Sequence, residues 1–359
     1  MPIPSTVRGS STQSVLHAAA ARAIAATLCT GGNAETVLFQ QLVGGDVLRA
    51  DRLLALTLSA NAVIEFCFGP TLGRVMDAIG RRKIFLGYPL YGVFAWTAVA
   101  LFPRNYWLVL AARTFGWVAV TMCGGTGPVS VALSDLVSGS ELAQANATFF
   151  AVIGAGVMAG QLIGDNILIW FGQPRFVFAA RAVLAGIHLA FNYLFFQETL
   201  PVAERRPFAG VVNPLRCFSV VLNMGAPLRK LMFIAMGQYC TEGKHLIGFR
   251  NLWLTTACGM GMRQWSNFGM AYSLAMIGGG QLAARCIQRF GRRGYTTLSN
   301  ITNMVGYACW SQPRLVPMWL GLAILLPGIN AVGTSASKAM CVDLATAQGM
   351  GKGEFASCE

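Results

Sequence analysis

The chain reads Gly73-Arg74-Val75-Met76-Asp77-Ala78-Ile79-Gly80-Arg81-Arg82-Lys83 between two long apolar segments. A partial copy of this stretch follows as Ala284-Arg285-Cys286-Ile287-Gln288-Arg289-Phe290-Gly291-Arg292-Arg293. The copy keeps the second glycine and the two arginines that follow it, and it has Gln288 where the first stretch has Asp77. Two copies of one short basic segment indicate that the chain is built from two related halves.

The composition argues against an ordinary soluble protein. Of the 359 residues, 55% are apolar and only 11% are charged, whereas soluble domains carry about 25% charged residues. The mean hydropathy is +0.54. A soluble domain of this size would still need a charged surface, but a surface that faces lipid does not. We therefore expect an all-α, multi-pass membrane protein in contact with the lipid bilayer.

Ten segments are apolar enough for membrane-spanning helices, which need about 20 residues each. They are expected at 15–39, 53–72, 84–102, 106–131, 145–170, 175–196, 231–250, 266–286, 294–311 and 315–337. The sequence therefore predicts five parts: a polar N-terminal tail (1–14), a bundle of six helices (15–196), a polar linker (197–230), a bundle of four helices (231–337) and a polar C-terminal tail (338–359).

The net charge of +13 comes from Lys and Arg that lie in short loops between apolar segments. This pattern orients membrane proteins and is not typical of a nucleic-acid-binding face. The two basic stretches and the linker hold more Lys and Arg than the loops on the opposite side. The bias predicts that both stretches, the linker and the N-terminus face the cytoplasm. Nucleic acid is not an expected partner.

Sites for metals, cofactors and catalysis find no support in the sequence. The ten cysteines are scattered without Cys-x-x-Cys spacing, and the three histidines lie far apart, so neither a zinc site nor a disulfide framework is predicted. There is no phosphate-binding Gly-x-x-x-x-Gly-Lys segment and no nucleophile with a base partner. We expect no metal, no cofactor and no enzymatic activity.

The first basic stretch resembles the loop between the second and third helices of major facilitator superfamily transporters. The resemblance implies two pseudo-symmetric helical bundles around a central cavity. It also implies that the aspartate meets the positive N-terminal end of helix 11 and holds one of two transport conformations. The residues of this implied switch are Gly73, Asp77, Gly80, Arg81 and Arg82. The alternative is that the stretch only anchors the topology of the membrane helices.

Anchoring of the topology is the expected role of the second, degenerate copy. The residues that it retains are Arg289, Gly291, Arg292 and Arg293. A complete member of the family has twelve helices, so the resemblance implies that this chain lacks the last two. The second bundle is expected to be incomplete for that reason.

The expected fifth helix contains a second resemblance, to the family's antiporter motif Gly-x-x-x-Gly-Pro-x-x-Gly-Gly. Gly156, Gly160 and Gly164 lie four residues apart on one face, where small residues let a neighbouring helix approach closely. Gln161 stands where the motif has proline, and Asp165 replaces its last glycine. The direction of coupling therefore stays open, and plain helix packing is the alternative.

Charged residues inside the expected helices are candidates for coupling or for the cavity. Arg113 resembles the buried arginine of the family's helix-4 motif, which is associated with proton coupling. A charge inside a membrane is costly unless paired, so it indicates either a function or a structural ion pair. Glu65, in the second helix, is a carboxylate suited to reversible proton binding. Further candidates are Arg22, Glu35 and Arg181, although Glu35 could instead lie near the outer surface.

Two features near the ends of expected helices complete the resemblance. Asp135 resembles the aspartate at the cytoplasmic end of helix 4, and we expect it to pair with the basic first stretch. The segment Gln197-Glu198-Thr199-Leu200-Pro201 resembles the end of helix 6 in drug:proton antiporters of the tetracycline-efflux type. This segment and the helix-5 motif favour that branch over sugar uptake.

The expected function is secondary transport of a small organic solute or drug by alternating access, with proton coupling left open. The expected partners are the solute, protons and the lipid bilayer, and the chain is expected to act as a monomer. Two alternatives stay open. One is a transporter-like receptor, scaffold or inactive truncated product, and the other is a facilitator without ion coupling. The sequence names neither the solute nor the membrane.

Overall fold

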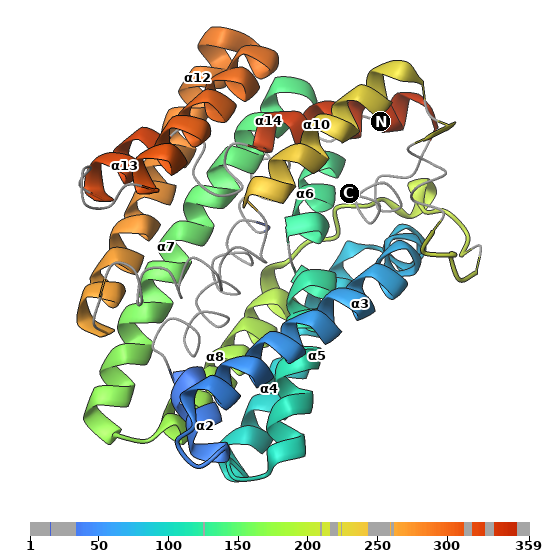
Figure 1. The fold of residues 1–359 in the computed structure, drawn as a ribbon. Coiled ribbons are helices and arrows are strands. Elements are labelled where there is room, and N and C mark those ends of the chain that lie inside the picture. The colour runs from blue at the N-terminus through green and yellow to red at the C-terminus, as the bar shows by residue number, and fades with distance from the viewer. Residues whose placement is uncertain are drawn as a thin grey trace. The chain divides into compact units, whose positions relative to one another are not determined.

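The computed structural model describes residues 15, 34–124, 126–208, 210–215, 222–223, 225–242, 259, 262–311, 318–326 and 334–349. Within these ranges the chain is helical apart from short connections, and it contains no β-strand (Figure 1). The helices divide into two compact units. Unit 1 takes its described residues from 1–136 and 156–217, and unit 2 takes them from 137–155 and 218–350.

The helices of unit 1 are α2 (Ala34–Leu42), α3 (Val47–Ile79), α4 (Arg81–Leu101), α5 (Tyr106–Gly124), α6 (Thr126–Leu136), α8 (Pro174–Phe195) and the short 3-10 helix η1 (Val202–Glu204). The long helix α7 (Gly139–Phe171) is shared between the units, with residues from 156 onward in unit 1. The other helices of unit 2 are α10 (Ala226–Glu242), α12 (Met262–Trp310), α13 (Met318–Leu325) and α14 (Ser335–Ala347).

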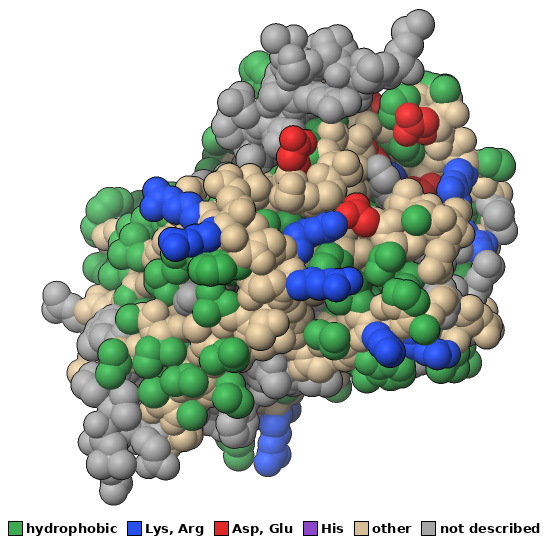
Figure 2. All heavy atoms as spheres, turned by 90° about the horizontal axis from the view of Figure 1, so that it is seen from above, with side chains coloured by type: hydrophobic (Ala, Val, Ile, Leu, Met, Phe, Trp, Pro, Cys, Tyr) green, Lys and Arg blue, Asp and Glu red, His purple; other side chains and the backbone are tan. Residues whose placement is uncertain are grey.

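Four helices in the described part of the chain are long and apolar enough to cross a membrane: α3, α4, α7 and α8. Large apolar side chains project from them into the surroundings, including Phe94 at 70% exposure and Ile169 at 76%. Figure 2 shows hydrophobic side chains exposed widely among scattered Lys and Arg. Such a surface suits lipid better than water. The helix α12, which holds two of the expected spans, is not among the four.

The interior of unit 1 joins five helices. α8 packs along α4, and α5 packs against both α3 and α4. A hydrophobic cluster gathers where α2, α3, α4, α5 and α8 meet, and its members include Phe39, Trp96, Val109 and Phe178. Burying such side chains is the main favourable term for packing in water, whereas in lipid it is close contact between helices that holds the bundle together.

The expected loop at residues 73–83 is almost entirely helical. α3 runs through Asp77 to Ile79, and α4 begins at Arg81. Gly80 alone breaks the helix, with φ 94° and ψ 169°. The second copy has the same form, because α12 is interrupted only at Gly291, with φ 71° and ψ 172°. A loop was expected because the stretch is charged. Hydropathy, however, indicates how deep a residue lies in the lipid and does not indicate where its helix ends.

Other expected boundaries also move. α14 continues as a helix to Ala347, so residues 338–347 do not belong to a polar tail. Its small residues form a buried face that polarity alone does not reveal, including Ala339 and Cys341. α10 begins at Ala226, inside the expected linker. Of the first expected segment, α2 shows that the helix ends at Leu42, whereas Arg22 and most of that segment lie outside the described residues.

Candidate functional site

One group of polar residues lies where α3 ends and α4 begins, and we call it the Gly80 cluster: Asp77, Arg81, Asp135, Thr199 and Glu198. Arg81 is its centre and is only 1% exposed. Its Nη1 lies 2.8 Å from Asp77 Oδ1, and its Nε lies 2.9 Å from Asp135 Oδ2. The Thr199 hydroxyl donates to the same Asp135 oxygen at 3.2 Å. A planar guanidinium between two carboxylates thus joins α3, α4 and the end of α6.

Glu198 caps α4 from a distant part of the chain. Its Oε1 accepts a hydrogen bond from the Arg81 backbone N–H at 2.8 Å, and its Oε2 accepts one from the Arg82 N–H at 3.4 Å. Gly80 precedes the helix and has no side chain to cap it, so the carboxylate satisfies amide groups that would otherwise lack a partner within the helix. A negative charge at a helix N-terminus is also favoured by the helix dipole.

The glycine at position 80 has two reasons to be glycine. Its positive φ is strained for other residues. In addition, a Cβ at this position would collide with Glu198 Oε2 and would lie 2.8 Å from Arg205 Nη2. The side chain of Arg205 itself holds Glu198 Oε2 at 3.3 Å. Glu198 belongs to the segment that resembles the end of helix 6, and its role as a cap of α4 was not predicted from the sequence.

The remaining residues of the first stretch point in different directions. Gly73 is buried on α3. Arg82 donates from Nη2 to the backbone oxygen of Tyr193, and its guanidinium carbon lies 5.8 Å from the centre of the Tyr193 ring. Arg82 therefore links the start of α4 to the end of α8.

Unit 2 contains a similar but simpler arrangement. Arg292 follows the positive-φ Gly291, and its Nη1 lies 2.6 Å from Asp343 Oδ2 on α14. Gln288, which stands in the place of Asp77, donates from Nε2 to Gln144 Oε1 at 3.3 Å. Asp343 was expected only at the start of a polar tail, and the signal that could have found it is the Asp-Leu pair shared with residues 135–136. Arg289 and Arg293 are exposed.

A second group lies inside unit 1, around Arg113 on α5. The Arg113 Nε lies 3.2 Å from Glu35 Oε1 on α2, and both residues are only 6% exposed. The Nη1 of Arg113 donates to the Leu54 backbone oxygen at 3.1 Å and to the Thr57 hydroxyl, both on α3. Its guanidinium carbon lies 5.7 Å from the centre of the Phe39 ring. The ion pair therefore joins three helices, and Glu35 is buried rather than solvated at a surface.

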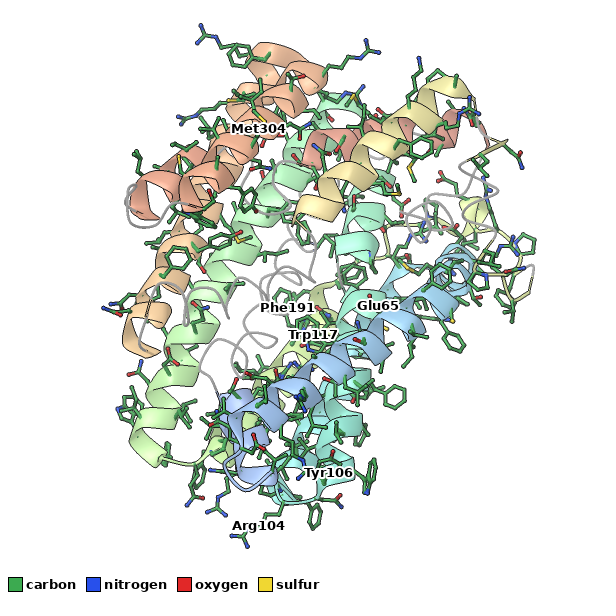
Figure 3. The ribbon with its side chains drawn as sticks, viewed as in Figure 1. Glu65, Arg104, Tyr106, Trp117, Phe191 and Met304 are labelled. Carbon is green, nitrogen blue, oxygen red and sulfur yellow. The ribbon has the colours of Figure 1, made fainter. Side chains whose placement is uncertain are left out.

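The carboxylate that pairs with Arg113 in the structure is Glu35. Glu65 is half-buried on α3, and its Oε1 accepts a hydrogen bond from the Asn61 amide at 2.9 Å. Figure 3 labels it near the middle of unit 1, together with Trp117 of α5 and Phe191 of α8, whereas Arg104 and Tyr106 lie at one end.

Arg181 and the glycines of α7 are buried. The Arg181 guanidinium carbon lies 3.7 Å from the centre of the Trp96 ring, and the side chain is 4% exposed, so the structure places it in the contact between α8 and α4. The α7 motif forms one buried stripe of an uninterrupted helix, with the residues Gly156, Gly160, Gln161 and Gly164. No group of His, Cys, Asp and Glu in the described part could hold a metal ion.

Comparison with known proteins places this arrangement in context. The family model of the Major Facilitator Superfamily matches residues 26–357. The tetracycline resistance protein of class C from Escherichia coli is 26% identical over 311 residues, which is 82% of this chain and 73% of that protein. Major facilitator superfamily domain-containing protein 10 from Homo sapiens is 28% identical over 202 residues, which is 55% of this chain and 40% of that protein.

Solved structures share the fold. The crystal structure of the human organic anion transporter MFSD10 (TETRAN) aligns with a TM-score of 0.67 at 19% identity, covering 99% of this chain and 92% of that chain. The proton:xylose symporter XylE aligns with a TM-score of 0.62 at 14% identity, covering 99% and 86%. At these identities the likeness concerns the fold alone.

Proposed function

The chain belongs to the major facilitator superfamily, and from this premise we propose that it carries a small organic solute across a membrane by alternating access, in exchange for protons. The observation that carries the proton coupling is the buried ion pair of Arg113 and Glu35. Ionisable residues inside membrane helices are rare and are retained mainly for function. Here two of them face each other in unit 1, which contains the candidate spans α3, α4 and α8 and the second part of α7.

Glu35 is the proposed proton-binding group, and Arg113 is its fixed counter-charge. A proton added to the Glu35 carboxylate removes the negative charge that attracts Arg113. The guanidinium stays charged at any physiological pH and keeps its hydrogen bonds to the Leu54 oxygen and Thr57. The contact between α2 and α5 therefore weakens when the proton binds. A proton that binds the two transport conformations with different affinity shifts their populations, which is the physical basis of coupling.

The Gly80 cluster is the proposed conformational switch, and we propose that it faces the cytoplasm. Its support is that one buried arginine joins three helices, so Arg81 cannot move without breaking contacts to Asp77 or Asp135. A set of contacts that is made in one state and broken in the other can hold a transporter in that state. Arg292 and Asp343 make the corresponding, simpler contact in unit 2.

The names of the relatives suggest the first solutes to try. One relative confers tetracycline resistance, and one structural relative is an organic anion transporter. We propose an amphipathic organic solute of this kind, exported in exchange for protons.

A flux assay in proteoliposomes tests the proposal. Purified protein is reconstituted, a pH gradient is imposed, and accumulation of tetracycline and of a fluorescent organic anion is measured with and without the gradient. We expect accumulation that collapses when a protonophore removes the gradient. Arg104→Ala is the matched control, because Arg104 is an exposed arginine at the far end of unit 1.

The two alternatives predict different results in the same assay. Flux that equilibrates at the same rate with or without the gradient would indicate an uncoupled facilitator. A folded, correctly inserted sample that moves none of a broad panel of solutes would indicate a receptor or scaffold instead of a carrier.

A further inference from the structure

The buried face of α8 carries three polar side chains in a row: Arg181, His188 and Asn192. They are 4%, 3% and 0% exposed. Each meets a residue of α4. Arg181 lies over Trp96, and the His188 ring meets the Tyr88 ring edge to face at 6.1 Å between centres. Polar groups that are buried between helices are normally hydrogen-bonded, and those that are not need an explanation.

Asn192 connects the two helices through one nitrogen atom. Its Nδ2 donates to the Phe85 backbone oxygen on α4 at 3.0 Å, and it lies 3.1 Å from His188 Nε2. The carbonyl of Phe85 can only accept, so the atom facing it is the amide nitrogen rather than the amide oxygen. An amide nitrogen has two hydrogens and accepts none. His188 Nε2 must therefore accept, which makes the ring neutral with its proton on Nδ1.

We propose that His188 is a proton-binding site, and that its protonation releases α8 from α4. A proton from the solution adds to the lone pair of Nε2, which turns this nitrogen from an acceptor into a donor. Two donors, Nε2–H and the Asn192 amide, would then face each other. The amide must turn about its last bond to present Oδ1 to the imidazolium, and by turning it breaks the hydrogen bond to the Phe85 oxygen.

The acceptor that this rotation needs is present. Within the part of the chain that the structure describes, Asn192 Oδ1 and the Tyr88 hydroxyl are buried and make no hydrogen bond. An unsatisfied buried oxygen is costly in the neutral state, and a hydrogen bond from the imidazolium would satisfy it. The same side chain thus favours the neutral ring in one orientation and the protonated ring in the other.

The charged and titratable groups around His188 come from the elements packed against it. They are Tyr88 on α4, which meets the ring, and Arg181 on α8 itself, whereas Glu35 on α2, which also packs against α8, is paired with Arg113. Arg181 stands seven residues away, about 10 Å along the helix axis. An unperturbed imidazole changes charge between about pH 5 and pH 8, and this is the pH range over which the site is tested.

Release of α8 at Asn192 acts on the Gly80 cluster. Phe85, whose oxygen is lost, also stacks on Phe196 at 4.6 Å between ring centres. Glu198, which caps α4, lies two residues after Phe196. A proton at His188 therefore loosens the same end of α4 that the proposed switch occupies. This use in transport rests on the proposed function, whereas the proton-binding site itself does not.

Nuclear magnetic resonance on the full chain tests the site. Protein labelled with nitrogen-15 histidine is placed in lipid nanodiscs, and His188 is assigned by comparison with His188→Gln. We expect Nδ1 to be protonated and Nε2 unprotonated at about pH 8, and Nε2 to gain a proton as the pH falls toward about 5. Asn192→Leu should abolish the tautomer preference. A proton on Nε2 at about pH 8, or a tautomer that Asn192→Leu leaves unchanged, would overturn the proposal.

Hydrogen exchange on the same nanodiscs tests the release. Peptides from α4 and α8 should exchange about fivefold faster at low pH, after correction for the intrinsic rate, because one interhelical hydrogen bond is lost. His188→Gln can still accept from Asn192 but cannot take the proton, so it should exchange alike at both pH values. An unchanged acceleration in this variant would refute the release. Neither measurement needs a solute, so a failed flux assay with these results intact would count against the transport function only.

Discussion

Arg292 holds Asp343 with 2.6 Å between Nη1 and Oδ2, just after a glycine of positive φ. Arg81 holds Asp135 in the same way, at 2.9 Å and also after such a glycine. Each half of the chain thus ends a helix at one glycine, begins the next with an arginine and ties that arginine to a later helix. The structural repeat is clearer than the sequence repeat, because the sequences around Asp343 and Asp135 share little beyond the Asp-Leu pair.

The two aspartates should differ in their importance for stability. Asp135 accepts from both Arg81 and Thr199 and its side chain is 3% exposed, whereas the side chain of Asp343 is 34% exposed. Asp135→Asn should lower the free energy of unfolding by roughly 3 kcal/mol, because it leaves a buried cation with one partner fewer. Asp343→Asn should have little effect. Thermal unfolding in detergent compares them, and an equal effect would show that the repeat is symmetric in energy too.

Gly80→Ala should destabilise the protein more than a positive φ alone explains. Alanine at this φ and ψ is strained by roughly 1–3 kcal/mol, and its Cβ would also displace the Glu198 carboxylate. Gly45→Ala is the matched control, since Gly45 has a φ of 91° and nothing within 4 Å of an added Cβ. The difference in melting temperature between the two variants measures the collision. Equal losses would mean that Glu198 moves aside without cost.

Glu198→Ala should loosen the first turn of α4. Loss of a capping side chain costs about 1 kcal/mol, and the amides of Arg81 and Arg82 would lose their acceptors. Hydrogen exchange at the start of α4 should accelerate about fivefold, with little change at its end. Glu204→Ala, which removes an exposed acid from the same segment, should leave the exchange as it is. Acceleration in the control would point to the net charge of the segment instead.

The buried ion pair can be separated into a structural and a functional part. Arg113→Leu alone leaves Glu35 buried without its counter-charge and should cost about 3 to 5 kcal/mol. The double variant Arg113→Leu with Glu35→Leu should recover most of the stability, because no buried charge is then uncompensated. Neither should accumulate solute against a gradient. Uphill transport by the stable double variant would remove the pair from the coupling mechanism.

Glu65 and Asp77 provide the last comparison. Glu65 is half-buried beside Asn61 and outside the ion pair, so Glu65→Gln should leave stability within about 0.5 kcal/mol and should alter coupling only if Glu65 binds the proton.

Asp77→Asn removes one of the two carboxylates that hold Arg81 and should slow transport more than it lowers the amount of protein in the membrane. Flux measured at equal amounts of protein checks both variants. A loss of transport by Asp77→Asn that only matches its lower expression would indicate a folding role.

Local features of the sequence predicted the family fold, and the comparisons confirm it. The repeated basic stretch, the low charge content and the long apolar segments are each legible over a few residues, because a membrane imposes the same demand on every span. The role of Gly80 could not be predicted from local features in this way. Charged residues continue the helix on either side of Gly80, and neither charge nor hydropathy reports a backbone φ.

Partner choice was decided by the tertiary structure. The sequence indicated Glu65 and Glu35 as candidate buried charges without assigning a partner to Arg113, and the structure brings Glu35 to it because α2 packs against α3 beside α5. It offered Arg181 as a cavity residue, and the packing of α8 on α4 buries it against Trp96. The sequence alone determined that this chain is a helical membrane protein of two related halves, since hydropathy and motifs are properties of neighbouring residues. Only the tertiary structure decided which charges meet, because residues far apart in the chain come within a few ångströms through the packing of whole helices.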